Sequence, residues 1–108
     1  MSRKKPILYI VIPCYNEEQV LPHTNPMFVE KIEQLVKKEE IHPLSKIMYV
    51  NDGSKDRTWE LIESYANSIP SVVGVSQSRN RGHQSSVLAG MYEAIQFADI
   101  VITIDADG

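Results

Sequence analysis

The stretch Ile7-Leu8-Tyr9-Ile10-Val11-Ile12, followed at once by Pro13-Cys14-Tyr15-Asn16-Glu17, decides the fold class of this chain. Its first six residues are apolar without a break, which is typical of a strand buried on both faces of a parallel sheet. Three further runs rich in isoleucine and valine follow, at residues 47–50, 72–75 and 100–104. The sequence therefore predicts four buried parallel strands.

The stretches between these runs have helical periodicity. Apolar residues at 28, 32, 35 and 36 form one stripe of a first helix, and Pro22 and Pro26 predict an irregular segment over residues 19–25 before it. A second helix is expected from Trp59 to Ile69, capped by Ser54 or Asp56 and ended by Pro70.

A third helix is expected to begin at Ser85 or in the loop before it. Its apolar stripe comprises Val87, Leu88, Met91, Ala94, Ile95 and Ala98. Trp59 and Met91 lie on helical stripes and are predicted to be in the core. The order β-α-β-α-β-α-β predicts an α/β fold, an open, mainly parallel, Rossmann-like sheet with helices on both faces.

Length and charge narrow the class of protein further. The 108 residues allow one domain, residues 1–108, and the sequence ends directly after the fourth strand, so we expect it to be incomplete at the C-terminus. The net charge of −3 argues against a nucleic-acid partner, and Arg3-Lys4-Lys5 is interpreted as a solvated tail. No apolar run approaches the roughly 18 residues of a membrane span. A single cysteine, Cys14, favours a reducing, cytoplasmic location.

Polar residues follow all four predicted strands. Because the carboxyl ends of parallel strands meet at one edge of a sheet, ligands bind there. Glu17 follows the first strand, Asn51 and Asp52 the second, Asn80 the third, and Asp105 and Asp107 the fourth. Paired carboxylates suit Mg²⁺ or Mn²⁺, although Asp and Gly at a strand end also form ordinary turns.

Other residues at this edge are open to two interpretations. Asp52 could accept a hydrogen bond from a ribose or a base, or belong to a turn in which Gly53 adopts a strained conformation. Arg79 and Arg81 could neutralise a phosphate or be solvated. Cys14 is interpreted as a packing residue because no histidine lies near it in the sequence. A dinucleotide-binding fingerprint and a P-loop are both absent.

Four segments together resemble the family 2 glycosyltransferases, inverting enzymes of the GT-A fold that use nucleotide-diphosphate sugars. These segments are Ile10–Glu17, Val50–Asp56, Asn80–Gly82 and Asp105–Gly108, in the order and spacing of the family. The stretch from Asn80 to Ala89 looks most like the branch that glucosylates polyprenyl phosphates, to which dolichol-phosphate mannose synthases are related. Asn51 departs from the family, which often has aspartate there.

The resemblance implies roles for individual residues. The nucleotide-sugar site would comprise Pro13, Tyr15, Glu17, Asp52, Asp105 and Ala106, with Tyr15 against the base. Asp105 and Asp107 would hold Mg²⁺ or Mn²⁺, which stabilises the diphosphate as a leaving group. The donor would be UDP-glucose or a similar nucleotide sugar, and the acceptor a lipid phosphate or another acceptor.

The resemblance also bears on the rest of the protein. Acceptor-side residues are expected beyond Gly108, so the chain by itself is expected to be inactive, and the full-length protein would act at the cytoplasmic face of a membrane. The alternative from another class is a non-catalytic, receiver-like nucleotide-binding module. Such modules also gather acidic residues at strand ends, but they need a later strand that carries a lysine.

Overall fold

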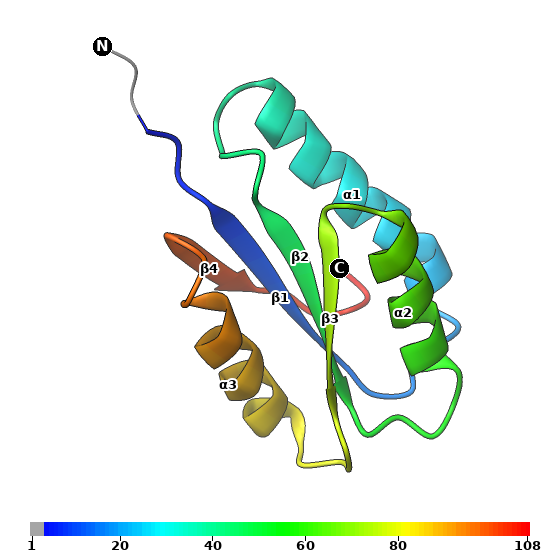
Figure 1. Ribbon diagram of the computed structural model, residues 1–108. Coiled ribbons are helices and arrows are strands. Elements are labelled where there is room, and N and C mark those ends of the chain that lie inside the picture. The colour runs from blue at the N-terminus through cyan, green and yellow to red at the C-terminus, as the bar shows by residue number, and fades with distance from the viewer. Residues whose placement is uncertain (1–3) are drawn as a thin grey trace.

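Residues 4–108, which the computed structural model describes, form four strands that alternate with three helices (Figure 1). In chain order the elements are β1 (Leu8–Cys14), α1 (Leu21–Lys37), β2 (Lys46–Asp52), α2 (Thr58–Ser68), β3 (Val72–Gln77), α3 (His83–Ala94) and β4 (Ile100–Thr103). Of the predicted basic tail, Arg3 lies outside the described residues, and Lys5 forms an ion pair with Glu39 at 3.1 Å.

All four strands are parallel and lie in one sheet in the order β3-β2-β1-β4. Ile10 of β1 pairs with Ile47 of β2 on one side and with Ile102 of β4 on the other. The strand order therefore reverses between β1 and β4, and this switch point is where open α/β sheets bind ligands. The predicted parallel α/β fold is confirmed.

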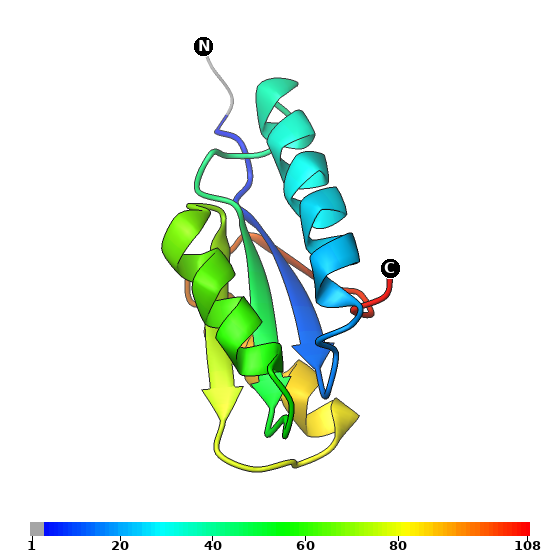
Figure 2. The ribbon, with the colours of Figure 1, turned by 90° about the vertical axis from the view of Figure 1, so that its right-hand side faces the viewer.

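Helices cover both faces of the sheet, as predicted: α1 and α2 lie on one face and α3 on the other (Figure 1), and Figure 2 looks onto the face that α1 and α2 cover. Ile10, Ile12 and Tyr49 face α1 and α2, which supply Phe28, Ile32 and Ile62 to the same cluster. Tyr9, Val11, Met48 and Val50 form a second cluster with Ala94 of α3. Alternate residues of β1 thus enter opposite cores, which explains why its sequence is continuously apolar. β4, at the edge, is mostly exposed, contrary to the expectation that every strand is buried.

The first helix corrects the prediction of an irregular segment over residues 19–25. α1 begins at Leu21, with Pro22 in its first turn, where an N–H has no helical partner. Pro26 lies inside the helix and removes one backbone hydrogen bond. The Tyr49 hydroxyl donates to Asn25 Oδ1 at 2.6 Å, and Leu21 and Phe28 are buried. These tertiary contacts stabilise the turn that local propensity disfavours.

The third helix packs on the sheet through a face that coincides only in part with the predicted one. Ala94 is buried and Ala98 packs against the second cluster, as expected. The buried residues of α3 are Ser86, Gly90 and Ala94, whereas Leu88, Met91 and Ile95 are exposed, so the expected core position of Met91 is wrong. A Cβ at Gly90 would lie 2.4 Å from Val11 Cγ1 and 2.7 Å from Val50 Cγ2. The helix therefore approaches the strands so closely that only small residues fit. Trp59, by contrast, packs against the core as expected.

We predict that Gly90→Ala destabilises the protein, because the added methyl group collides with two buried valines. Overpacking of this kind costs about 1–3 kcal/mol, measurable by urea unfolding. Ser85→Ala, at an exposed position of the same helix, is the control and should change the unfolding free energy by less than about 0.5 kcal/mol. Equal stability of the two variants would contradict the close approach of α3.

Candidate functional site

A cleft of about 350 Å³ lies at the carboxyl ends of the strands. Every site residue predicted from the sequence contributes to its wall, namely Pro13, Tyr15, Glu17, Asp52, Asp105, Ala106 and Asp107. Cys14, Asn80, Gly82, His83 and Ser86 line it as well. The loops after all four strands therefore meet at one cavity beside the β1/β4 switch point.

The segment after β4 is a turn. A backbone hydrogen bond from Gly108 N–H to the Asp105 carbonyl, at 3.0 Å, closes it, and Ile104 N–H donates to the Val11 carbonyl at 3.1 Å at its start. Ala106 is buried in the core, while Asp105 and Asp107 on either side are exposed. The buried alanine thus anchors the turn and leaves both carboxylates free to face the cleft or the solvent.

Asp52, at the end of β2, holds the loop that precedes α3. Its Oδ1 accepts a hydrogen bond from Arg81 N–H at 2.7 Å, and its Oδ2 accepts one from Gly82 N–H at 3.0 Å. The residue is only 3% exposed. Each carboxylate oxygen retains one further lone pair, so Asp52 organises one wall of the cleft and still has acceptor capacity toward it.

The turn after Asp52 requires glycine, as the sequence suggested. Gly53 has a φ of +64°, and a Cβ there would lie 2.3 Å from the backbone nitrogen of Asn80. The loops after β2 and β3 are therefore in direct backbone contact. Asn51 faces away from the cleft lining: its Nδ2 donates to Ser76 Oγ at 3.1 Å, and its Oδ1 accepts from Ser54 N–H at 3.2 Å. Asn51, which stands where the family often has aspartate, therefore makes structural contacts between loops and does not line the cleft.

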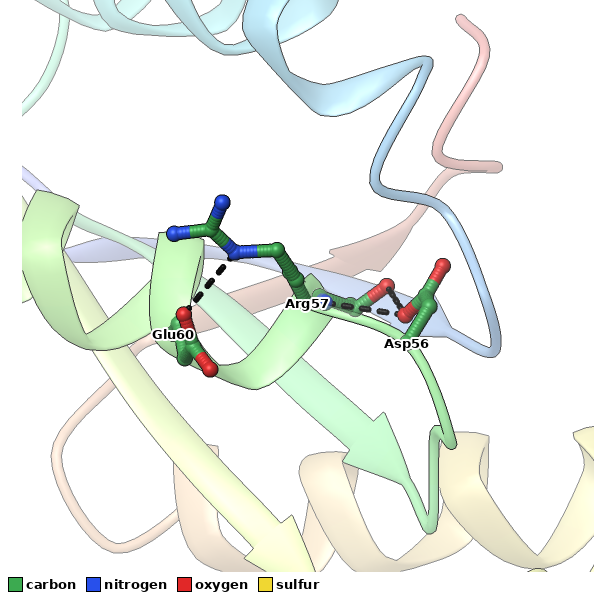
Figure 3. Close-up of polar contacts among 4 residues, drawn as sticks. Asp56, Arg57 and Glu60 are labelled. Carbon is green, nitrogen blue, oxygen red and sulfur yellow. Dashed lines mark hydrogen bonds and ion pairs between the residues drawn. The ribbon is translucent and has the colours of Figure 1, made fainter.

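Negative charge accumulates at the cleft. Burial raises the pKa of Glu17, and repulsion from Asp107, Asp56 and Asp105 raises it further. In residues 4–108 the only ion pairs are Lys5–Glu39 and Arg57–Glu60, so no basic side chain neutralises this group (Figure 3 shows the second pair). An uncompensated acidic cluster of this kind attracts a cation or hydrogen-bond donors.

Cys14 lies in the wall of the cleft as a neutral thiol. It is 1% exposed and donates to the Ile12 carbonyl at 3.5 Å. Burial raises the pKa of the thiol well above its ordinary value, and the nearby Glu17 carboxylate adds to the effect. A thiol that stays protonated is a poor nucleophile, in agreement with the packing role expected from the sequence.

Two residues of the cleft were missed by the sequence analysis. α3 begins at His83, two residues earlier than Ser85, so the first turn of the helix enters the wall with His83 and Ser86. The Asn80–Gly82 segment could have indicated this earlier start, because Gly82 is the N-cap residue of α3. Arg79 and Arg81, for which the sequence left open a phosphate contact or solvation, are exposed and lie outside the cleft lining. Only the backbone of Arg81 takes part, through Asp52.

Comparison with protein families gives an independent result. The model of glycosyl transferase family 2 matches residues 9–108. An uncharacterized glycosyltransferase of Bacillus subtilis (strain 168), YkoT, is 43% identical over 107 residues, which cover 99% of this chain and 32% of that protein. The dolichyl-phosphate beta-glucosyltransferase ALG5A of Trichomonas vaginalis is 36% identical over 94% of this chain and 30% of its own length. The bactoprenol glucosyl transferase of Shigella phage SfX is also 36% identical, over 91% of this chain and 30% of its length.

Solved structures show the same fold. The mannosyltransferase PcManGT from Pyrobaculum calidifontis, in complex with GDP-Man and Mn²⁺, matches with a TM-score of 0.70 at 21% identity, over 96% of this chain and 28% of that one. TarS from S. aureus (residues 1–349, with UDP) matches with a TM-score of 0.68 at 20% identity, over 94% of this chain and 27% of that one. Both likenesses establish the GT-A architecture.

The parallel sheet and its helices define an α/β domain of the GT-A type. The chain belongs to glycosyl transferase family 2. The resemblance stated from the sequence is thus confirmed, and the receiver-like alternative is set aside. The chain spans about a third of the length of the curated relatives it matches.

We predict that Asp52→Ala loosens the loop before α3, because it removes the acceptor of Arg81 N–H and one of the two acceptors of Gly82 N–H, which also donates to Asn80 Oδ1. Hydrogen bonds to a charged group contribute about 1.5–3 kcal/mol, so urea unfolding should show a loss in this range. Amide exchange at Arg81 and Gly82 should also accelerate. Asp99→Ala is the control: it removes a carboxylate that accepts from Ile7 N–H at 2.9 Å and should leave exchange at these two amides unchanged. Unchanged exchange at both amides in Asp52→Ala would contradict this role.

We predict that Glu17→Gln raises the melting temperature at pH 7. Since the pKa of Glu17 is higher in the folded protein than in the unfolded chain, its ionised form opposes folding. The stabilisation should be complete above the folded-state pKa and disappear as the pH falls below the ordinary glutamate pKa of about 4.3. Glu63→Gln, an exposed position on α2, controls for the loss of one negative charge. An equal gain in both variants, or a gain that persists at pH 3, would show that the local repulsion is not the cause.

Proposed function

We propose that the cleft binds the nucleotide diphosphate of a sugar donor together with Mg²⁺ or Mn²⁺. On this proposal the chain supplies the donor site of an inverting glycosyltransferase that transfers a hexose. The observation that carries the proposal is the convergence of Tyr15, Glu17, Asp52, Asp105 and Asp107 on one cleft at the β1/β4 switch point. Family 2 membership supplies the reaction type.

We assign the base, the ribose and the metal ion to different residues of the cleft. Tyr15 is 41% exposed beside the cleft and offers an aromatic face to the base. Asp52 has acceptor capacity for a base N–H or a ribose hydroxyl in addition to its two backbone contacts. Asp105 is assigned to the ribose and the metal together, and Asp107 to the metal. Pro13 and Ala106 shape the wall between them.

The donor set of the cleft fits a hard divalent cation. Asp105 and Asp107 offer oxygen ligands only and are in no ion pair within residues 4–108. Among the same residues, no three His, Cys, Asp or Glu side chains are placed to hold a metal ion by themselves. Mg²⁺ is typically bound by one or two carboxylates plus substrate phosphates, so the nucleotide would complete the site. When bound, the ion neutralises the diphosphate as a leaving group.

For the acceptor we propose a polyprenyl phosphate. Two relatives are named for transfer of this kind, the dolichyl-phosphate and bactoprenol enzymes. The phosphate of such an acceptor is already anionic, so its attack on the sugar needs no general base from this chain. No helix of residues 4–108 is long and apolar enough to cross a membrane. We place the full-length protein in the cytoplasm or at the cytoplasmic face of a membrane, where nucleotide sugar and lipid phosphate would meet.

The expected outcome is coupled binding of nucleotide and metal. In calorimetric titrations, UDP or GDP should bind at least tenfold more tightly with Mn²⁺ or Mg²⁺ than with EDTA, and Mn²⁺ alone should bind weakly. Asp107→Asn should abolish the enhancement and leave the affinity in EDTA within about threefold. Asp99→Asn, which lies before β4 and outside the cleft, should behave like the wild type. Equal affinity for both nucleotides with and without metal would overturn the metal assignment.

A further inference from the structure

The segment that carries Tyr15 and Glu17 into the cleft is held by the loop after β2. Asn16 has a φ of +53°, its N–H donates to Ser54 Oγ at 3.0 Å, and its Oδ1 accepts from Lys55 N–H at 2.9 Å. Asn16 is therefore fixed on both its backbone and its side chain. Because it lies between Tyr15 and Glu17, the direction in which these two side chains leave the backbone depends on it.

Thr58, the first residue of α2, makes the central contact. Its side chain is completely buried, and its Oγ1 accepts from Glu17 N–H at 2.7 Å. The Glu17 carbonyl in turn accepts from Val20 N–H at 3.1 Å and Leu21 N–H at 3.0 Å, the first turn of α1. The backbone of Glu17 is thus fixed on both sides. Without the Thr58 hydroxyl, the Glu17 N–H would lose its partner in a part-buried position.

Asp56 orients the Thr58 hydroxyl. Its Oδ1 accepts from both the N–H and the hydroxyl of Thr58, and its Oδ2 accepts from Glu18 N–H at 3.3 Å. Since the hydroxyl proton points to Asp56, the oxygen lone pairs are left for Glu17. Figure 3 shows Asp56 at the start of α2, next to the loop that follows β1. Neither Asp56 nor Thr58 belongs to the cleft lining.

We propose that Asp56 and Thr58 are positioning residues for nucleotide binding, which act through the backbone of residues 16–18 and touch no part of the ligand. The inference rests on the proposed function, because it assigns the cleft to a nucleotide diphosphate. It extends the site from the residues that line the cleft to a pair at the start of α2, Asp56 just before the helix and Thr58 as its first residue, that determines where Tyr15 and Glu17 lie. The pair acts as a unit: Asp56 fixes the hydroxyl proton of Thr58, and Thr58 fixes Glu17.

The test compares Thr58→Val, which removes the hydroxyl at nearly constant volume, with Thr58→Ser, which keeps it. Ser45→Ala is a matched control. Ser45 is also completely buried, and its Oγ accepts a backbone N–H, that of Leu8 at 2.9 Å, at the start of β1 and away from the cleft. Asn16→Gly is a second, milder variant, since glycine accepts the positive φ and only the side-chain contact to Lys55 is lost.

Two measurements are made on each variant, well below its melting temperature. The first is the Kd of UDP and GDP with Mn²⁺ by calorimetry, and the second is amide exchange of residues 15–20 without nucleotide. We expect Thr58→Val to weaken nucleotide binding at least tenfold and to accelerate exchange at Glu17 at least tenfold. Asn16→Gly should weaken binding several-fold. Thr58→Ser should restore both values to within about threefold of the wild type.

The control separates positioning from stability alone. Ser45→Ala should lower the melting temperature, leave nucleotide affinity within about twofold, and accelerate exchange only near Leu8. The proposal is overturned if Thr58→Val binds nucleotide like the wild type, or if Ser45→Ala weakens binding to the same extent. If the wild type binds neither UDP nor GDP, the proposed function fails. The positioning role is tested separately by amide exchange: it is overturned if exchange is unchanged at Glu17 in Thr58→Val and at residues 15–20 in Asn16→Gly.

Discussion

The parallel pairing of β1 with both β2 and β4 is the constraint on which the rest of the molecule depends. Ile10 is aligned with Ile47 on one side and Ile102 on the other, and both faces of β1 are buried. A shift of one residue would exchange the residues that face α1 with those that face α3, so the register is strongly determined. Because the strands are parallel, the loops that follow β1, β2 and β4 all lie at the same edge of the sheet.

The cleft at that edge combines ordered backbone with unbalanced charge. Backbone amides satisfy Asp52, whereas Glu17, Asp105 and Asp107 repel one another without a basic partner in the described residues. The repulsion among these carboxylates lowers the stability of the free protein. A bound cation would relieve this repulsion and so stabilise the folded state. The end of β2 and the loop that follows it connect the neighbouring loops. Ser54 accepts a hydrogen bond from Asn16 N–H in the loop after β1, and Asp52 accepts one from Arg81 N–H in the loop after β3.

The sequence predicted the strands and the lining of the cleft well, for a physical reason. Continuous apolar runs have few alternatives to a buried parallel strand, and the rule that parallel strands share one carboxyl edge then places Glu17, Asp52 and Asp107 together. Roles at the site remain predictions. Features that depend on contacts distant in the sequence were not predictable in this way. The helical turn around Pro26 depends on Tyr49, and the choice of face on α3 depends on how closely Gly90 approaches Val11.

The small residues that bring α3 close to the sheet have a further consequence, which concerns solubility. With Ser86, Gly90 and Ala94 turned inward, the larger apolar side chains of that region face the solvent, including Leu88 at 66% and Tyr92 at 72% exposure. Ile100 and Ile102 of the edge strand β4 are also exposed. An apolar edge strand is a template for pairing with other chains, and a net charge of −3 provides little mutual repulsion. At high protein concentration we therefore expect copies of this chain to associate through β4 and α3, more so as added salt screens the charge that remains.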